Sequence, residues 1–220
     1  QAGALSFEIF SNDKKLISNS GYYPDTENRL NKLSKSTALQ NTLSIEDFSS
    51  SDFIKSSNNF LIQKDLKIEN KNIVFEKNYW KISASHNGYF KKFKLDHHRE
   101  IEFYPEQFKF IGHDKIVRKD PDKQIKFDIR FHLHPDSKIM KTQNNKFILI
   151  QLEDEGWQFS CDNYDINIDN GLYFGNKNSY QENQNIFISG MNSKSEQIIK
   201  WEISKISVSY THLTLPTSRS

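Results

Sequence analysis

The chain has 220 residues, of which 30 are basic and 28 acidic, and its formal net charge is +2. This balance provides neither the basic stripe that binds nucleic acid nor an acidic tail. The single cysteine, Cys161, excludes an internal disulfide, and no apolar run reaches the ~20 residues of a membrane span. A chain of this length can bury about 70% of its unfolded surface, so it needs no disulfide or metal to fold.

Short strand patterns separated by turn residues fill the chain, and its 17 Phe, 9 Tyr and 3 Trp suit pleated, half-buried surfaces. In chain order the segments are ALSFEIF, KKLISNSG, TALQNTLSIED, NIVFEKNYWKISASH, GYFKKFKLDHHREIEFY, QFKFIGHDKIV, QIKFDIRFHLHP, KFILIQL, GWQFSC, YDINID, NIFISG and EQIIKWEISKI. The joints HNGY, DNGL and EDEGW read as hairpin turns. The helix signal is confined to ENRLNKLSKS, residues 27–36. We therefore predict an all-β fold, a large antiparallel β-sandwich of two meandering sheets with almost no helix.

The two ends of the chain predict its domain organisation. It begins without Met and directly on a strand pattern, ALSFEIF, in which Leu5, Phe7 and Ile9 alternate onto one face. We expect that the chain is cut from a longer protein and that its targeting signal lies in the missing part. At the other end, VSYTHLTLPTSRS resembles a translated sequencing adapter. We therefore expect one domain over residues 1–206 and a non-native tail over 207–220.

The stretch FHLHPD places His132 and His134 two residues apart on a predicted strand, so they share one face. Phe131 and Leu133 then share the other face, which we expect to be core, while the two histidines face solvent or a cleft. Two imidazoles leave a zinc site short of ligands, and no Glu follows them. A structural role is favoured, contact with a sugar is the second possibility, and a metal enzyme built on the two is the weakest.

The remaining chemically active side chains give weaker signals. His97 and His98 are adjacent and should point to opposite faces, while His86 and His113 each fall at a predicted turn. Cys161 reads as a buried, inert thiol.

The long irregular segment 21–37 belongs to a class of loop that is often functional. Its Tyr22, Tyr23 and Arg29 could face a sugar or pack down the loop.

Several blocks in order, QAGALSFEIF, KKLISNSG, KSTALQNTLSIED, SHNGYFKKFKLDHHREI, IRFHLHPD and EGWQF, resemble the C-terminal domain of the heparinase II/III-like family, over roughly residues 1 to 206. In that family an α/α toroid precedes an antiparallel β-sandwich and carries most of the catalytic residues. The resemblance therefore implies that this chain is the second part alone, with its own N-terminal toroid missing.

The resemblance also implies a chemistry, the cleavage of uronate-containing polysaccharides by β-elimination. A base removes the C5 proton of a uronate whose carboxylate is neutralised, and an acid protonates the leaving oxygen. The resemblance puts the residues that do this upstream of Gln1, so we expect no catalytic residue in this chain and no activity from it alone. Its expected role is to support and line the substrate cleft, for which the candidates are Gln1, Tyr22, Tyr23, Arg29, His132 and His134.

The family further offers a zinc site built by a His, an Asp and a second His. Gln1, Asn19 and Gln40 match these three positions, so an amide replaces each ligand. Amide oxygens are weak zinc ligands beside imidazole and carboxylate, and we expect that zinc is lost and that the amides hydrogen-bond one another instead.

The expected partners are an acidic polysaccharide and the missing toroid, without nucleic acid or a membrane span. A bacterial periplasm or cell envelope is the expected location, with the cytoplasm as the alternative. The rival function is a non-catalytic glycan-binding or structural module with a degenerate metal site.

Overall fold

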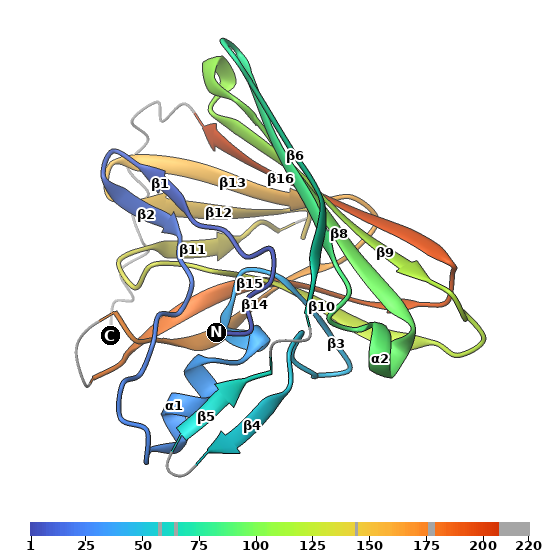
Figure 1. Ribbon diagram of the computed structural model, residues 1–220. Helices are drawn as coiled ribbons and strands as arrows, with labels where there is room; N and C mark the ends of the chain where they lie inside the picture. Colours follow the sequence, from blue (N-terminus) through green and yellow to red (C-terminus); the bar gives the residue numbers. More distant parts are fainter. Residues whose placement is uncertain (57–58, 64–65, 144, 176–178, 207–220) are drawn as a thin grey trace.

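Two antiparallel sheets form the body of the molecule in the computed structural model, which describes residues 1–56, 59–63, 66–143, 145–175 and 179–206 (Figure 1). From edge to edge, the eight-stranded sheet contains β11 (Lys138–Lys141), β12 (Phe147–Leu152), β13 (Glu155–Cys161), β16 (Glu196–Ile206), β9 (Lys109–Arg118), β8 (Leu95–Tyr104), β7 (Tyr79–His86) and β6 (Ile68–Glu76). The four-stranded sheet contains β14 (Ile166–Tyr173), β15 (Gln181–Asn192), β10 (Ile125–His132) and β3 (Leu43–Ile45). The predicted antiparallel, all-β fold is confirmed.

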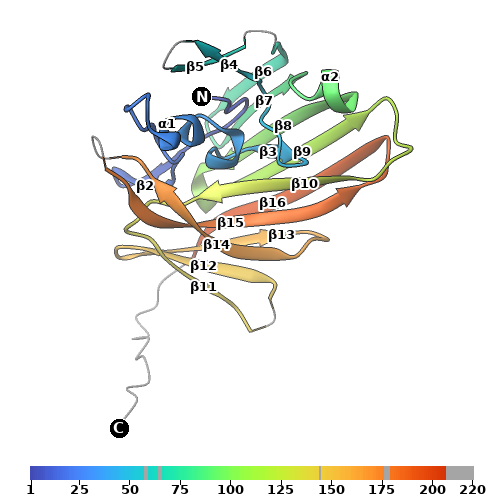
Figure 2. The same ribbon diagram turned by 90° about the horizontal axis from the view of Figure 1, so that it is seen from below.

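Smaller elements surround the two sheets. They are the hairpins β1 (Ile9–Ser11) with β2 (Lys14–Ile17) and β4 (Phe53–Ser56) with β5 (Asn59–Ile62), the helices α1 (Arg29–Ser34) and α2 (Phe90–Phe93), and the 3-10 turns η1 (Thr37–Leu39) and η2 (Pro105–Gln107). α1 lies inside the predicted helical segment 27–36. Figures 1 and 2 show α1 and β5 beside the N-terminus of the chain. No helix in the described ranges is long and apolar enough to cross a membrane.

The core lies between the two sheets, where the odd-numbered residues of β10 meet the eight-stranded sheet. Phe131 is fully buried, and its ring centroid lies 4.8 Å from that of Phe159 on β13 and 4.9 Å from that of Trp201 on β16. Leu133 is 1% exposed. The alternation of apolar residues had assigned Phe131 and Leu133 to the core, and this is confirmed.

The first predicted strand is shorter than its pattern. β1 begins only at Ile9, and residues 1–8 cross the eight-stranded sheet as an irregular segment. In this segment the ring of Phe7 stacks on Trp201, with centroids 5.5 Å apart. Leu5 has a positive φ of 58° and cannot continue an extended strand. Tertiary packing therefore replaces the strand that the alternation predicted.

Two of the three predicted hairpin turns are wrong. HNGY leads from β7 into α2, and DNGL lies inside β14, where all eight residues of the strand pair with β15. EDEGW does contain the turn between β12 and β13. The meander is also interrupted, because β16 inserts between β9 and β13 while β10, β14 and β15 belong to the other sheet. The predicted tail 207–220 lies outside the described residues.

Candidate functional site

The N-terminus of the chain is tied to the end of α1 by side-chain amides. Asn28 caps the start of this helix, with its side chain accepting a hydrogen bond from Leu30 N at 3.0 Å. At the other end the carbonyl of Ser34 accepts from the amide of Gln1 at 3.3 Å and from that of Gln40 at 3.4 Å. Gln1 also donates to the carbonyl of Gly21. The last carbonyls of a helix have no hydrogen-bond donor within the helix. Here the side-chain amides of two glutamines donate to one of these carbonyls, that of Ser34.

Asn41 joins this end of the chain to β10. Its backbone N–H donates to Asn19 Oδ1 at 2.9 Å, and its side chain donates to the carbonyl of Phe7 at 2.9 Å. The oxygen of the same side chain accepts from the backbone N–H of His132 at 2.6 Å. We call Gln1, Asn19, Gln40 and Asn41 the amide clasp, because together they bind the N-terminal segment, the residues after β2, α1 and β10.

The clasp does not fit a zinc ion. The amide nitrogens of Gln1 and Gln40 point at backbone carbonyls, and Asn19 Oδ1 already accepts a backbone hydrogen bond. Within the described residues, no group of three His, Cys, Asp or Glu side chains could hold a metal ion. The expectation that the amides bond one another needs correction, since in the described part of the chain they bond to backbone groups. The reason is that the end of α1 presents its unpaired carbonyls to them.

His132 is not at a surface, contrary to the expectation that it faces solvent or a cleft. Its side chain is 1% exposed, and Nε2 lies 2.9 Å from the carbonyl of Ala38 in η1. Burial lowers its pKa to about 4. The outer face of β10 is therefore covered by η1 at this position. His134 remains partly exposed, and its ring meets Tyr173 edge-on at 5.2 Å.

A buried charged cluster, which we call the Asp114 network, lies on the inner face of β7, β8 and β9. Arg99 Nε and Nη2 donate to the two carboxylate oxygens of Asp114 at 2.8 and 3.0 Å, and Trp201 Nε1 donates to Oδ2 at 2.8 Å. His97 Nε2 lies 2.6 Å from Oδ1, and its Nδ1 lies 3.1 Å from Nε2 of His86. Arg99 and all other members are at most 3% exposed.

The proton positions in this network follow from its hydrogen bonds. His86 Nδ1 accepts from the backbone N–H of Gly88 at 3.1 Å, so a neutral His86 carries its proton on Nε2 and donates to His97. His97 then carries its proton on Nε2 and donates to Asp114. Burial lowers the pKa of both histidines. Burial alone would raise the pKa of Asp114, but the charge of Arg99 and the bond from His97 hold it well below its ordinary value.

The Asp114 network also reaches the amide clasp. Arg99 Nη1 donates to the carbonyl of Leu5 at 3.0 Å and to that of Asn41 at 2.5 Å. The position of the N-terminal segment is thus coupled to a buried ion pair. Sequence reasoning missed this cluster, although His97, Arg99 and Asp114 fall in predicted strands and His86 falls at the turn predicted directly after one. The missing information was the register, which pairs His86 with His97 and Arg99 with Asp114.

Aromatic side chains gather beside the clasp, where the residues after β2 run along the end of β14. Gly21 pairs with Phe174, and the N–H of Phe174 donates to the carbonyl of Ser20 at 2.6 Å. Tyr23 meets Phe174 edge-on at 5.7 Å, and Phe174 meets Tyr180 at 6.4 Å. The group, which we call the aromatic ledge, consists of Tyr22, Tyr23, His134, Tyr173, Phe174 and Tyr180.

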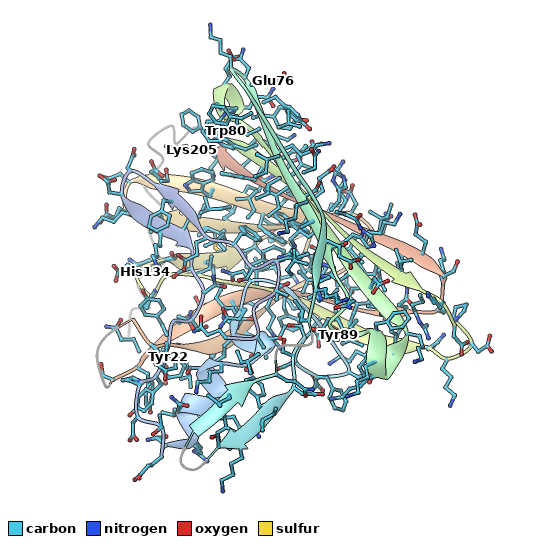
Figure 3. The ribbon with its side chains drawn as sticks, viewed as in Figure 1. Tyr22, Glu76, Trp80, Tyr89, His134 and Lys205 are labelled. Carbon is cyan, nitrogen blue, oxygen red and sulfur yellow. The ribbon has the colours of Figure 1, made fainter. Side chains whose placement is uncertain are left out.

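The ledge contains three of the predicted cleft residues, Tyr22, Tyr23 and His134. Tyr22 is 44% and Tyr180 53% exposed, and Figure 3 shows Tyr22 and His134 on the same side of the molecule. The Tyr22 hydroxyl accepts from the side chain of Asn31 at 3.1 Å. Arg29 is exposed at the first position of α1. Gln1, Tyr22, Tyr23 and His134 are therefore brought to one region, whereas His132 is buried beneath η1.

The other singled-out side chains lie apart from this region. His97 is buried and His98 half-buried on the opposite face, as adjacency in a strand predicts. His113 is in the middle of β9, so its assignment to a turn is wrong. Cys161 is half-buried, and burial raises its pKa to about 12, which leaves it an unreactive thiol at neutral pH.

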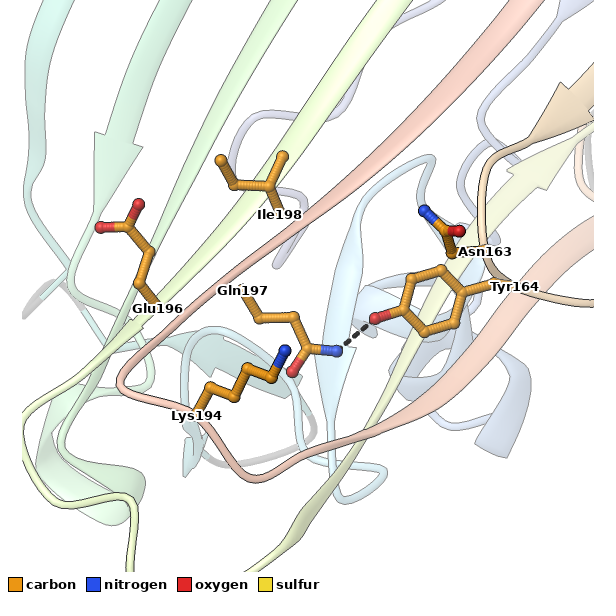
Figure 4. A pocket seen from close by; sticks show the side chains of 6 residues that line it. All are labelled: Asn163, Tyr164, Lys194, Glu196, Gln197 and Ile198. Atoms are coloured by element: carbon orange, nitrogen blue, oxygen red, sulfur yellow. Dashed lines mark hydrogen bonds between the residues drawn. The ribbon is translucent and has the colours of Figure 1, made fainter.

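The hollows in the surface also lie apart from the ledge. One of about 430 Å³ is lined by Asn163, Tyr164, Lys194, Glu196, Gln197 and Ile198, and Gln197 donates to the Tyr164 hydroxyl (Figure 4). A second, of about 400 Å³, includes His98, His113 and Lys115 on the outer face of the larger sheet. The predicted cleft residues do not line either one.

Solved structures and a curated protein resemble this chain. Heparan sulfate lyase HepC from Pedobacter heparinus matches 94% of this chain and 31% of its own, with a TM-score of 0.77 and 13% identity. The Heparinase III-BT4657 gene product matches 94% of this chain and 30% of its own, with a TM-score of 0.74 and 14% identity. FtsZ-localized protein C of Caulobacter vibrioides (strain NA1000 / CB15N) is 24% identical over 219 residues, which are 93% of this chain and 37% of that protein.

The chain thus spans about a third of the length of these proteins. At such identities the solved structures establish the fold, an antiparallel sandwich of the kind described above. The model of one family, described as Heparinase II/III-like, C-terminal, matches residues 1–202. The chain therefore belongs to the heparinase II/III-like family and corresponds to the C-terminal domain of its members.

Proposed function

We propose that this domain serves a polysaccharide lyase that cleaves uronate-containing polysaccharides by β-elimination, and that it supports and lines the substrate cleft. The observation that carries the proposal is the family match over residues 1–202, together with a fold shared with a heparan sulfate lyase. The catalytic base and acid lie in the preceding α/α toroid, and the sandwich alone is inactive. A bacterial periplasm or cell envelope accompanies this function.

The aromatic ledge is the part of the domain that faces the polysaccharide. It adjoins Gln1, and this proposal puts the preceding domain on the N-terminal side of that residue. Exposed rings such as Tyr22 and Tyr180 can pack against the apolar faces of sugar rings, because they combine a rigid surface with a polar hydroxyl. Arg29, also exposed, offers a guanidinium that can pair with a uronate carboxylate in a bidentate manner.

The test is made on the full-length protein, with its preceding sequence and without residues 207–220. Heparan sulfate, heparin, hyaluronan and alginate are each supplied, and the ultraviolet absorbance of the unsaturated uronate is followed. We expect product from one of them, and a fall in kcat/KM of about tenfold, ~1.4 kcal/mol, for Tyr22→Ala and for Arg29→Ala. Phe10→Ala is the matched control, since Phe10 is 58% exposed on β1 and outside the ledge.

A second function, a non-catalytic glycan-binding or structural module, is favoured by two observations. The curated relative is named for its localisation with FtsZ and not for a lyase activity, and amides stand at the three family zinc positions. A cytoplasmic location belongs with this alternative. Folded full-length protein that releases no unsaturated uronate from any polymer, yet is retarded by one of them in affinity electrophoresis, would replace the lyase with this module.

A further inference from the structure

An uncovered apolar surface lies on the inner face of the eight-stranded sheet, at the end where β6 and β7 meet. We call it the aromatic row, and it consists of Ile73, Phe75, Trp80, Ile82, Phe103 and Phe110. Phe75 is 75% exposed, Ile73 74%, Ile82 54% and Trp80 39%. Figure 3 shows Trp80 and Glu76 at this end of the molecule, where the β6–β7 hairpin projects beyond the smaller sheet.

The rings of the row form a continuous series across four strands. Phe75 stacks on Trp80 with centroids 4.9 Å apart, and Trp80 meets Phe103 at 5.0 Å. Phe103 stacks on Phe110 at 4.3 Å. The side chains therefore support one another in a fixed arrangement instead of lying singly on the surface. A contiguous exposed apolar patch of this kind marks an interaction site in a soluble protein.

The row continues the face that forms the core. Phe110 pairs with Ile203 and Gly112 with Trp201, and both Ile203 and Trp201 are buried. Phe7 of the N-terminal segment covers Trp201. The inner face thus extends beyond the part that the smaller sheet and the N-terminal segment cover. The residues beyond that limit keep a core-like composition although nothing in the described part of the chain buries them.

Three kinds of partner could cover the row, and the observations favour one. A sugar needs ring faces, whereas the two aliphatic side chains Ile73 and Ile82 are among the most exposed members. A second copy adding its strand to the edge of β6 would meet the bulge between Glu69 and Asn72, where Asn70 has a φ of 52°. The related proteins, by contrast, each carry about two thirds of their length outside the part that this chain matches.

We propose that the aromatic row docks an apolar surface of the domain that precedes this one in the full-length protein. The contact continues the packing of residues 5–7, which already lie on the same face of the sheet. The interface concerns how the domains of the protein assemble. The proposal therefore does not depend on whether the protein is a lyase.

Thiol labelling in the full-length protein tests the interface. In a Cys161→Ser background, single cysteines replace Ile73 and Ile82 in the row. The matched controls are Asn72→Cys and Ser83→Cys, the next residues on β6 and β7, which pair with each other on the opposite face. Each rate of maleimide modification is divided by the rate of the same variant in urea. We expect the two row positions to react at least about tenfold more slowly than their controls, because a covered thiol reacts only when the interface opens.

Each other outcome overturns the proposal. Equal labelling of row and control positions would show that the row is open to solvent. Protection that disappears on dilution would assign the row to a second copy of the protein. Protection that requires added heparan sulfate or alginate would assign it to a glycan. None of these readouts depends on turnover, so the result is separate from the lyase assay.

Discussion

Asp114 is the centre of the buried network on β7, β8 and β9. It is fully buried and accepts charge-assisted hydrogen bonds from Arg99 and His97 as well as one from Trp201. Because Arg99 also holds the carbonyls of Leu5 and Asn41, removal of the carboxylate charge affects both the sheet and the amide clasp.

We predict that Asp114→Asn lowers the free energy of unfolding by about 3–5 kcal/mol, since it leaves the Arg99 charge buried without its counter-ion. Urea denaturation followed by tryptophan fluorescence measures the change. Glu202→Gln is the control, because it removes a surface ion pair with Lys109, and we expect less than about 1 kcal/mol. Similar values for the two variants would contradict a structural role for the buried ion pair.

The buried histidines predict that acid destabilises the protein. Burial lowers the pKa values of His86, His97 and His132, the last to about 4, so the unfolded chain binds protons more readily than the native one. Their contribution is fully present above pH ~6.5, the ordinary histidine pKa, and is lost as the pH falls toward the lowered native values.

The expected slope of unfolding free energy between pH 6 and 5 is up to about 1.4 kcal/mol per pH unit for each histidine. His132→Gln removes one of these groups and should therefore reduce the slope by up to about 1.4 kcal/mol per pH unit. The slope is measured from the urea midpoints at each pH. Phe10→Ala, which removes an exposed side chain without a titratable group, should leave the slope unchanged. A variant series with the same slope throughout would mean that His132 is solvated in the native state.

At the scale of elements, hydrogen bonds of the amide clasp connect the N-terminal segment, α1 and β10. We therefore predict that the melting temperature is the same with a chelator and with added zinc. The triple variant Gln1→His, Asn19→Asp, Gln40→His should instead bind zinc. Its free energy of unfolding should rise by about 2.7 kcal/mol when the free zinc concentration is 100 times the Kd of the variant for zinc. Loss of stability in the native chain on treatment with a chelator would contradict the clasp as a substitute for zinc.

At the scale of the whole molecule, the sandwich is held by its two sheets up to Ile206, the last residue of β16. Residues 207–220 resemble an adapter translation, and we therefore predict that the domain does not need them. Deletion of this segment is expected to change the melting temperature of the full-length protein by less than about 2 °C. In a domain of this size, such a shift corresponds to a change of less than ~1 kcal/mol in the free energy of unfolding. A larger fall in scanning calorimetry would show that the tail belongs to the fold.

The sequence by itself determined the class of fold and much of its core. Alternation along β10 predicted that Phe131 and Leu133 are buried, because successive side chains of a strand point to opposite faces. The same local rules located α1 and the turn in EDEGW. They failed at DNGL, where pairing of the whole of β14 with β15 outweighs the turn preference of Asn-Gly.

Only the tertiary structure decided the burial of His132 and the assembly of the Asp114 network. Period-two alternation gives the side of a strand but not what covers it, and η1 covers the outer face of β10 through a contact between residues 94 positions apart. The Asp114 network depends on the register of β7, β8 and β9, which joins His86 to Asp114 through partners that are distant in sequence. Register and coverage arise from packing of the whole chain, and for that reason local patterns could not reveal them.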